Sequence, residues 1–138
     1  MNQFEQYTEK LKKLHLTVDE KAFLDEVKTY VANNMVDGHL SIASIANGIS
    51  IHESKMRRRI NQITGLTPST FLTVLRMQRA HQLLGKYPST SIAHIAFECG
   101  YADHSHFTHT FRRLFGMSPS QYAKQLTSQK KLSSKNSV

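Results

Sequence analysis

The sequence predicts an all-α protein of about seven helices, and three observations lead to this prediction. Apolar residues recur along the chain at the three- and four-residue spacing of helices that bury one face. No segment alternates apolar and polar residues as a half-buried strand would. One helical pattern also occurs twice, its second copy lying about 50 residues after the first. We therefore expect two similar helical units, which are too few for a solenoid.

The repeat is defined by two matching blocks in each copy. Residues 42–46 (IASIA) match residues 92–96 (IAHIA) at an offset of 50, and residues 65–71 (GLTPSTF) match residues 116–122 (GMSPSQY) at an offset of 51. The change of offset falls between the blocks, where both copies are expected to turn. A loop can absorb a one-residue insertion, so the change is compatible with two copies of one unit.

Each copy is typical of a short helix, a tight turn and a second helix. In the second copy, Ser91 is placed to cap the short helix, Gly100 to end it, and Asp103 to cap the helix that follows. The first copy begins at Ser41, and its second helix is expected from about residue 53 to residue 63. This arrangement is the helix-turn-helix motif, whose second helix can enter the major groove of DNA.

The remaining segments complete the expected organisation. Asp19 is expected to cap a helix running to about residue 34, residues 68–84 to form one long helix that Gly85 and Pro88 stop, and residues 119–126 to form a closing helix. Residues 1–18 carry apolar residues at helix-compatible spacing and are expected either to dock on the domain or to connect it to something upstream; these residues are Phe4, Tyr7, Leu11 and Leu14. The resulting divisions are 1–18 as an N-terminal leader or connector, 19–67 as a first helix-turn-helix subdomain, 68–86 as a linker helix, 87–126 as a second helix-turn-helix subdomain, and 127–138 as a disordered basic tail.

Positive charge is concentrated in the last two-thirds of the chain. The 138 residues include 18 Lys+Arg and 10 Asp+Glu, a formal net charge of +8. Residues 1–37 hold 5 basic and 7 acidic residues, whereas residues 38–138 hold 13 basic and 3 acidic residues, a net of +10. A solvated basic face is one interpretation, but this excess is larger than solubility requires and favours a nucleic acid or another anionic surface as partner.

The second helix of each motif has an apolar face and a polar face. The apolar faces consist of Met56, Ile60 and Ile63 in the first motif, and of Phe107, Phe111 and Leu114 in the second. At 100° per residue, the first motif is expected to point Ser54, Arg58 and Asn61 outward, with Lys55 and Arg57 at their sides. The second motif is expected to point Ser105, His109 and Arg112 outward, with Thr108 beside them. Arg113 is expected to contact a phosphate. Arg is suited to guanine edges, and Ser, Thr, Asn and His can bond base edges or phosphates.

Three further segments resemble one known family. Residues 91–101 (SIAHIAFECGY), 107–113 (FTHTFRR) and 116–122 (GMSPSQY) are similar to the second helix-turn-helix and closing motif of AraC/XylS-family transcription regulators. The segment 71–84 is similar to that family's linker helix, and the resemblance extends from about residue 20 to residue 126. It implies that the linker holds both recognition helices on one face, so that they enter successive major-groove turns about 34 Å and 10 bp apart.

The resemblance also implies which residues contact bases. The positions that match the family's base-contacting sites are Ser54, Arg57 and Arg58 in the first helix, and His104, Ser105, Thr108 and His109 in the second. The first motif departs from the family pattern at three positions: Ser50 stands where the turn glycine is usual, His52 where a Ser cap is usual, and Ile60 where Phe is usual.

The sequence therefore predicts a sequence-specific double-stranded DNA-binding module that regulates bacterial transcription, by activation. A non-specific architectural DNA-binding protein is the alternative, and a large ratio of specific to non-specific affinity would exclude it. The resemblance implies RNA polymerase as a partner and a sensing or receiver domain supplied elsewhere, because 138 residues leave no room for one. The chain is then either a short stand-alone member or part of a longer regulator.

Other classes of function have little support in the sequence. It contains no Gly-rich phosphate loop, nucleophile elbow, carboxylate pair or zinc motif, so we expect neither an enzyme nor a cofactor. Three histidines lie at positions 104, 106 and 109, but their spacing places His106 on a different helix face, so we expect no metal site.

Cysteine use and hydropathy indicate the compartment. Cys99 is the single cysteine, so no intramolecular disulfide can form, and we expect a reducing compartment, the cytoplasm. No segment approaches the roughly 20 apolar residues that span a bilayer, and we expect no membrane partner. Cys99 is expected to be a buried core residue, as are Ile95, Ala96 and Phe97.

Overall fold

The computed structural model describes residues 1–36 and 38–135, with side chains described up to residue 129 apart from residue 37. Within these residues the chain forms eight α-helices and no strand, which confirms the all-α prediction. The helices are α1 (Gln3–Lys12), α2 (Val18–Asn34), α3 (Ile42–Gly48), α4 (Glu53–Thr64), α5 (Pro68–Lys86), α6 (Ile92–Glu98), α7 (His104–Phe115) and α8 (Pro119–Lys135).

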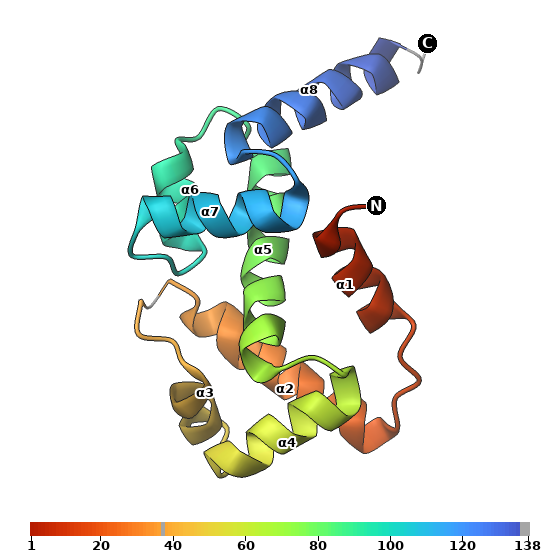
Figure 1. Ribbon diagram of the computed structural model, residues 1–138, viewed down its shortest axis with the longest axis vertical. Coiled ribbons are helices and arrows are strands. Elements are labelled where there is room, and N and C mark those ends of the chain that lie inside the picture. The colour runs from red at the N-terminus through yellow and green to blue at the C-terminus, as the bar shows by residue number, and fades with distance from the viewer. Residues whose placement is uncertain (37, 136–138) are drawn as a thin grey trace.

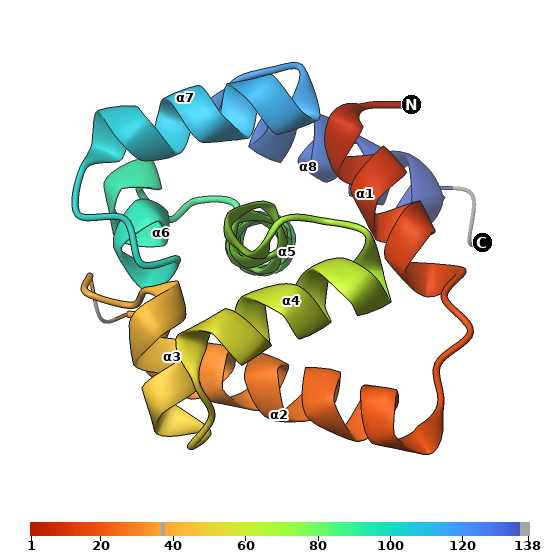
Figure 2. The same cartoon turned by 60° about the horizontal axis from the view of Figure 1, so that its bottom comes forward.

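The linker helix α5 stands at the centre of the molecule. Figure 1 shows α2, α3 and α4 around one end of α5 and α6, α7 and α8 around the other, while α1 lies alongside α5. Seen nearly along α5, the other helices surround it, with α1 on one side and α3 and α6 on the opposite side (Figure 2). The two helix-turn-helix units are thus held at opposite ends of one 19-residue helix.

Side-chain caps fix where most of these helices begin. The hydroxyl groups of Ser41, Thr67 and Ser91 each accept a hydrogen bond from the backbone N–H three residues later. The cap of α2 differs from the prediction, because Thr17 rather than Asp19 occupies that position. Thr17 and Glu20 form a reciprocal capping box, which satisfies two backbone donors at once.

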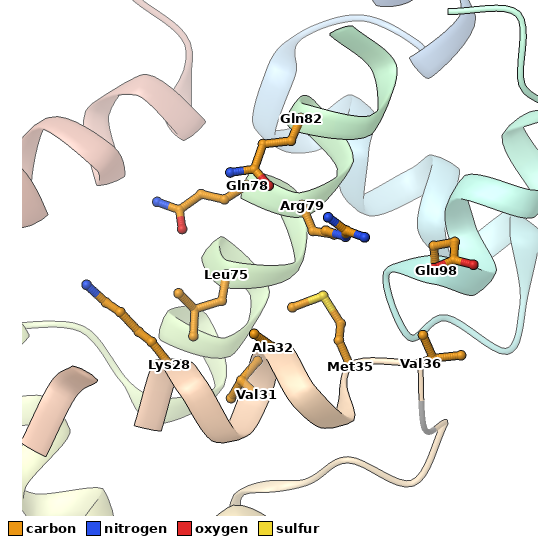
Figure 3. A pocket seen from close by; sticks show the side chains of 10 residues that line it. All are labelled: Lys28, Val31, Ala32, Met35, Val36, Leu75, Gln78, Arg79, Gln82 and Glu98. Carbon is orange, nitrogen blue, oxygen red and sulfur yellow. The ribbon is translucent and has the colours of Figure 1, made fainter. Parts of the chain in front are cut away.

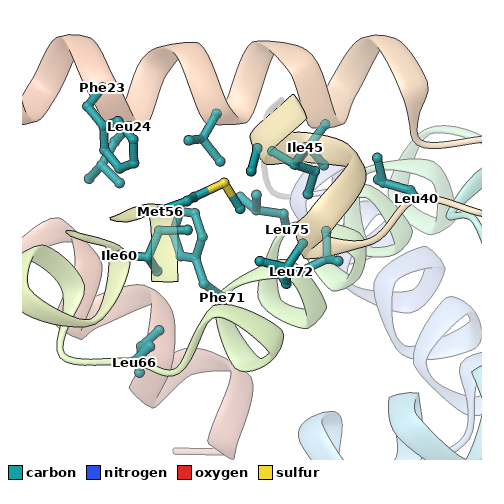
Figure 4. Packing of buried hydrophobic residues seen from close by; sticks show 14 of the residues in the cluster. Phe23, Leu24, Leu40, Ile45, Met56, Ile60, Leu66, Phe71, Leu72 and Leu75 are labelled. Atoms are coloured by element: carbon teal, nitrogen blue, oxygen red, sulfur yellow. The ribbon is translucent and has the colours of Figure 1, made fainter. Parts of the chain in front are cut away.

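The core consists of two clusters, one in each subdomain. The first, shown in Figure 4, packs α2, α3 and α4 around Phe71, Leu72 and Leu75 of α5. The second packs α6 and α7 against Met77, Ala80, Leu83 and Leu84 of the same helix. Because α5 contributes side chains to both clusters, the subdomains cannot turn about the linker without disrupting one of them.

Two more sequence predictions need correction, besides the cap of α2. The closing helix does not end near residue 126, because α8 continues to Lys135, so most of the expected disordered tail 127–138 is helical; residues 136–138 lie outside the described residues. The segment after residue 126 contains no Gly or Pro to break the helix, and the Thr127 hydroxyl donates to the carbonyl of Ala123. The long helix expected over residues 68–84 extends to Lys86, the last residue of the expected linker division 68–86, and Pro88 follows two residues later.

Phe97 is the third correction. It was expected in the core, but its side chain is 55% exposed, whereas Ile95 and Ala96 are buried. At 100° per residue Phe97 lies about 140° round the helix from Ile92 and therefore points away from the buried face. None of the described helices is at once long enough and apolar enough to cross a bilayer.

Candidate DNA-binding interface

The core of each subdomain positions one recognition helix. In α4, Met56 and Ile60 are 0% and 1% exposed and pack in the first cluster. In α7, Phe107 and Phe111 are both 0% exposed and occupy the corresponding positions in the second cluster. These anchors fix the rotation of each helix about its own axis, so the same relative positions of both helices face solvent. The two helices also start on the same side of the molecule, beside α3 and α6 (Figures 1 and 2).

The polar face of α4 is exposed as the sequence predicts. The five candidate residues on this helix are all exposed: Ser54, Lys55, Arg57, Arg58 and Asn61. Arg57 is held by Glu53, whose Oε1 accepts hydrogen bonds from Nε at 3.0 Å and from Nη2 at 2.7 Å. Arg58 has no such partner among the interactions found in the described residues, so its guanidinium is available to a ligand. Arg58 is therefore better placed than Arg57 to bond a base without first breaking an ion pair.

Arg59 leans away from this polar face and toward α2. Its guanidinium lies 4.2 Å from the centre of the Phe23 ring and makes a cation–π contact with α2. Arg59 therefore helps to dock α4 on α2 and is not available on the polar face.

The candidate residues of α7 fall into three groups. His104, Ser105, His109 and Arg112 are exposed. Thr108 is half-buried, and its Oγ1 is buried without a hydrogen-bond partner among the described residues. Arg113 is exposed but lines a hollow with Gln3 and Tyr7 of α1 and with Thr73 of α5. It thus extends along the side of α7 that faces α1.

The turns of the two motifs explain part of the difference in their sequences. Gly100 has φ 86°, and a β-carbon there would collide with the carbonyl oxygen of Met35, so glycine is required for two reasons. Ser50 occupies the matching turn with φ 62°, a left-handed conformation that costs a non-glycine residue about 1–2 kcal/mol. His52, the N-cap of α4, makes no capping hydrogen bond with its side chain, whereas Asp103, the N-cap of α7, accepts a hydrogen bond from the N–H of Ser105.

An inter-subdomain contact was not predicted from the sequence. Arg76 of α5 donates through Nη2 to the carbonyl of Leu40 at 3.3 Å, and its guanidinium lies 5.4 Å from the centre of the Tyr101 ring. Leu40 precedes the first motif and Tyr101 lies in the turn of the second, so one side chain braces both. The sequence offered no signal, because Arg76 falls in the exposed-looking part of a helical pattern.

Cys99 and the histidines can be assessed from their surroundings. Cys99 is 0% exposed, and burial raises the pKa of its thiol to about 12, so the prediction of a buried core residue is confirmed. In the part of the chain that the structure describes, no three His, Cys, Asp or Glu side chains are grouped closely enough to hold a metal ion.

A cavity of about 360 Å³ lies between the subdomains (Figure 3). Its walls come from the C-terminal part of α2, from one face of α5 and from Glu98 of α6. Apolar groups such as Met35 and Leu75 lie beside the polar ends of Lys28 and Arg79. None of the candidate DNA-contacting residues lines it.

Comparison with known proteins identifies the fold. A family model described as "Helix-turn-helix domain" matches residues 45–125, more than half of the chain. The structure is similar to the crystal structure of a transcriptional regulator with an AraC-type DNA-binding domain from Chromobacterium violaceum, with 29% sequence identity and a TM-score of 0.70, over 80% of this chain and 96% of that one. The chain belongs to the AraC/XylS family of DNA-binding domains.

Other relatives support this membership. The crystal structure of a DNA-binding transcriptional dual regulator from Escherichia coli K-12 is 31% identical, with a TM-score of 0.67, and is matched over 75% of this chain and 90% of that one. The HTH-type transcriptional activator RhaS from Escherichia fergusonii is 42% identical over 80 residues, which make up 58% of this chain and 28% of the relative. The match thus spans less than a third of the activator's length. As a member of the AraC/XylS family, the chain is a DNA-binding domain of the kind found in transcription regulators.

Proposed function

We propose that this domain binds a specific bipartite sequence of double-stranded DNA by inserting α4 and α7 into successive turns of the major groove. The observation that carries the proposal is the equivalence of the two helices. Each is fixed by buried anchors at matching positions, and each exposes Ser, Arg, Asn or His side chains on the opposite face. These side chains can bond base edges, and the excess of basic residues provides the attraction to phosphate.

Within this proposal the residues have different roles. Arg58 and Asn61 on α4 and Ser105 and His109 on α7 face outward from the helices and are proposed to read bases. Lys55, Arg112 and Arg113 are proposed to contact phosphates or the edges of the groove. Arg57 and His104 lie at the flank of their helices and are proposed to add further contacts to the DNA. Thr108 is proposed to do the same, because its buried hydroxyl group has no hydrogen-bond partner among the described residues.

We further propose that DNA binding activates bacterial transcription through contact with RNA polymerase. This follows from the similarity to RhaS, which is named as a transcriptional activator. A sensing or receiver domain is proposed to act on this domain within the full-length regulator, in the bacterial cytoplasm where the DNA lies.

Selection of bound duplexes from a random DNA library tests the proposal. The expected result is an enriched bipartite motif whose halves are separated by about one helical turn, about 10 bp. Recovery of no motif, with equal affinity for all duplexes, would contradict the proposal and favour a non-specific architectural DNA-binding protein.

A further inference from the structure

The N-terminal helix α1 contacts both subdomains. Phe4 belongs to the second cluster, Leu11 packs against the first, and Tyr7 packs against both. Figure 2 shows α1 lying beside α5 and extending between α7 and α4. Of the two alternatives that the sequence leaves open for this segment, docking on the domain or connecting it to something upstream, the structure shows docking, and the helix bridges both subdomains.

The contacts of α1 are made at the C-terminal ends of the two recognition helices. Phe4 is 7% exposed and stacks on Phe115, the last residue of α7, with ring centres 4.4 Å apart. At the other end of α1, the ammonium of Lys10 lies 3.5 Å from the carbonyl oxygen of Gly65, the C-cap of α4. One short helix thus touches corresponding points on both DNA-reading elements.

This bridge lies on a different side of the linker from the contact made by Arg76. Arg76 joins Leu40 to Tyr101 near α3 and α6, whereas α1 lies on the opposite side of α5 (Figure 2). Contacts on two sides of a central helix restrain the subdomains against both twisting and bending. Helix α1 also lies outside residues 45–125, the part of the chain that matches the family model.

We propose that α1 is a strap that sets the separation and relative rotation of α4 and α7, and thereby determines which half-site spacing the chain accepts. This inference rests on the proposed bipartite DNA binding. The key side chains are Phe4 and Tyr7, which act by positioning the recognition helices and do not themselves touch DNA. One inserted base pair moves the second half-site by about 3.4 Å and rotates it by about 35°. If α1 fixes the positions of α4 and α7, the two helices cannot both reach their half-sites after such an insertion.

The first arm of the test measures geometry without DNA. Nitroxide labels are attached at Ser54→Cys and Ser105→Cys, and their distance distribution is measured by pulsed electron paramagnetic resonance. Cys99 is buried with a thiol pKa of about 12 and stays unlabelled. In the otherwise wild-type chain a single narrow distribution is expected, and Phe4→Ala should broaden or shift it. An unchanged distribution in Phe4→Ala would overturn the strap.

The second arm measures spacing preference with unlabelled protein and the duplex that the wild-type chain selects. One base pair inserted between the half-sites should weaken wild-type binding by roughly tenfold, as the loss of one base-pair contact would. In Phe4→Ala the same insertion should cost only about threefold or less, because a loosened second helix can still find its site. Equal penalties in both proteins would also overturn the strap.

Two controls separate positioning from simple loss of stability. Gln6→Ala changes an exposed residue of α1 and should behave as wild type. Ile95→Val and Ile95→Ala weaken the second cluster from α6, and the one whose melting temperature lies nearer that of Phe4→Ala is used. A relaxed spacing preference in that control would assign the effect to stability and contradict the proposal. If the wild type selects no bipartite motif, the proposed function fails, while the distance measurement still decides whether α1 is a strap.

Discussion

Two glycines with positive φ, Gly100 and Gly116, provide a test of how the subdomains pack. Gly100 and Gly116 have φ values of 86° and 76°, so an added β-carbon strains the backbone similarly at both. The space around them differs, because a β-carbon at Gly116 would meet nothing within 4 Å, whereas one at Gly100 would collide with the carbonyl oxygen of Met35 at the end of α2. Comparing the two alanine variants therefore isolates the contact between subdomains.

The expected losses follow from these surroundings. At Gly116, left-handed strain of about 1–2 kcal/mol is partly offset by about 0.4–1 kcal/mol from the stiffer unfolded chain, leaving roughly 1 kcal/mol. At Gly100 the collision adds about 1–3 kcal/mol, because two backbone segments must separate. Gly100→Ala should then destabilise the chain by about 2–4 kcal/mol, and at about 3–5 °C per kcal/mol for a chain of this size its melting temperature should fall by about 10 °C.

Urea and thermal unfolding followed by circular dichroism measure both variants against the wild type. Gly100→Ala should lose at least about 1 kcal/mol more unfolding free energy than Gly116→Ala. Similar losses at the two positions would mean that the Met35 carbonyl can move away at no cost, and that this contact does not hold the subdomains together.

Three further predictions concern DNA contacts and pH. Arg58→Ala should weaken binding to the selected duplex by about 1–3 kcal/mol and relax preference in one half-site only, as measured by repeating the selection; equal weakening on all sequences would make Arg58 a phosphate contact. Arg113→Ala should lower affinity on every duplex and reduce the slope of log affinity against log salt by about one, and an unchanged slope would remove Arg113 from the interface. Burial lowers the pKa of His81, whose Nδ1 lies 2.6 Å from the Tyr122 hydroxyl, so the unfolded chain binds this proton more readily than the folded chain. The stability that neutral His81 contributes is present in full above about pH 6.5 and is lost as the pH falls below that value. His81→Gln should therefore flatten this part of the profile of unfolding free energy against pH. An unaltered profile would contradict the role given to His81.

Much of the fold follows from local sequence signals. Apolar spacing and capping residues such as Ser41, Ser91 and Asp103 predicted the two motifs within about one residue of where they begin and end. The repeat predicted the equivalence of α4 and α7 because matching anchors, Met56 with Phe107 and Ile60 with Phe111, occur at the same places in both copies.

The features that were missed depend on contacts between distant parts of the chain. Nothing in the local pattern of Phe4 shows that it stacks on Phe115, and nothing around Arg76 shows that it bonds the carbonyl of Leu40. Phe97 differs for another reason: its apolar side chain suggests burial, but helical geometry points it outward. Most of the candidate DNA-contacting residues were exposed as predicted, because exposure on a recognition helix follows from periodicity alone.

If α4 and α7 each read one half of a bipartite site, substitutions on the two helices must affect different halves of the motif. This is tested by repeating the random-library selection with Arg58→Ala and with His109→Ala, which occupy matching positions on the two helices. Each variant should lose sequence preference in a different half of the wild-type motif and keep it in the other half. Loss of preference in the same half, or across the whole motif, would show that the two helices do not read separate half-sites.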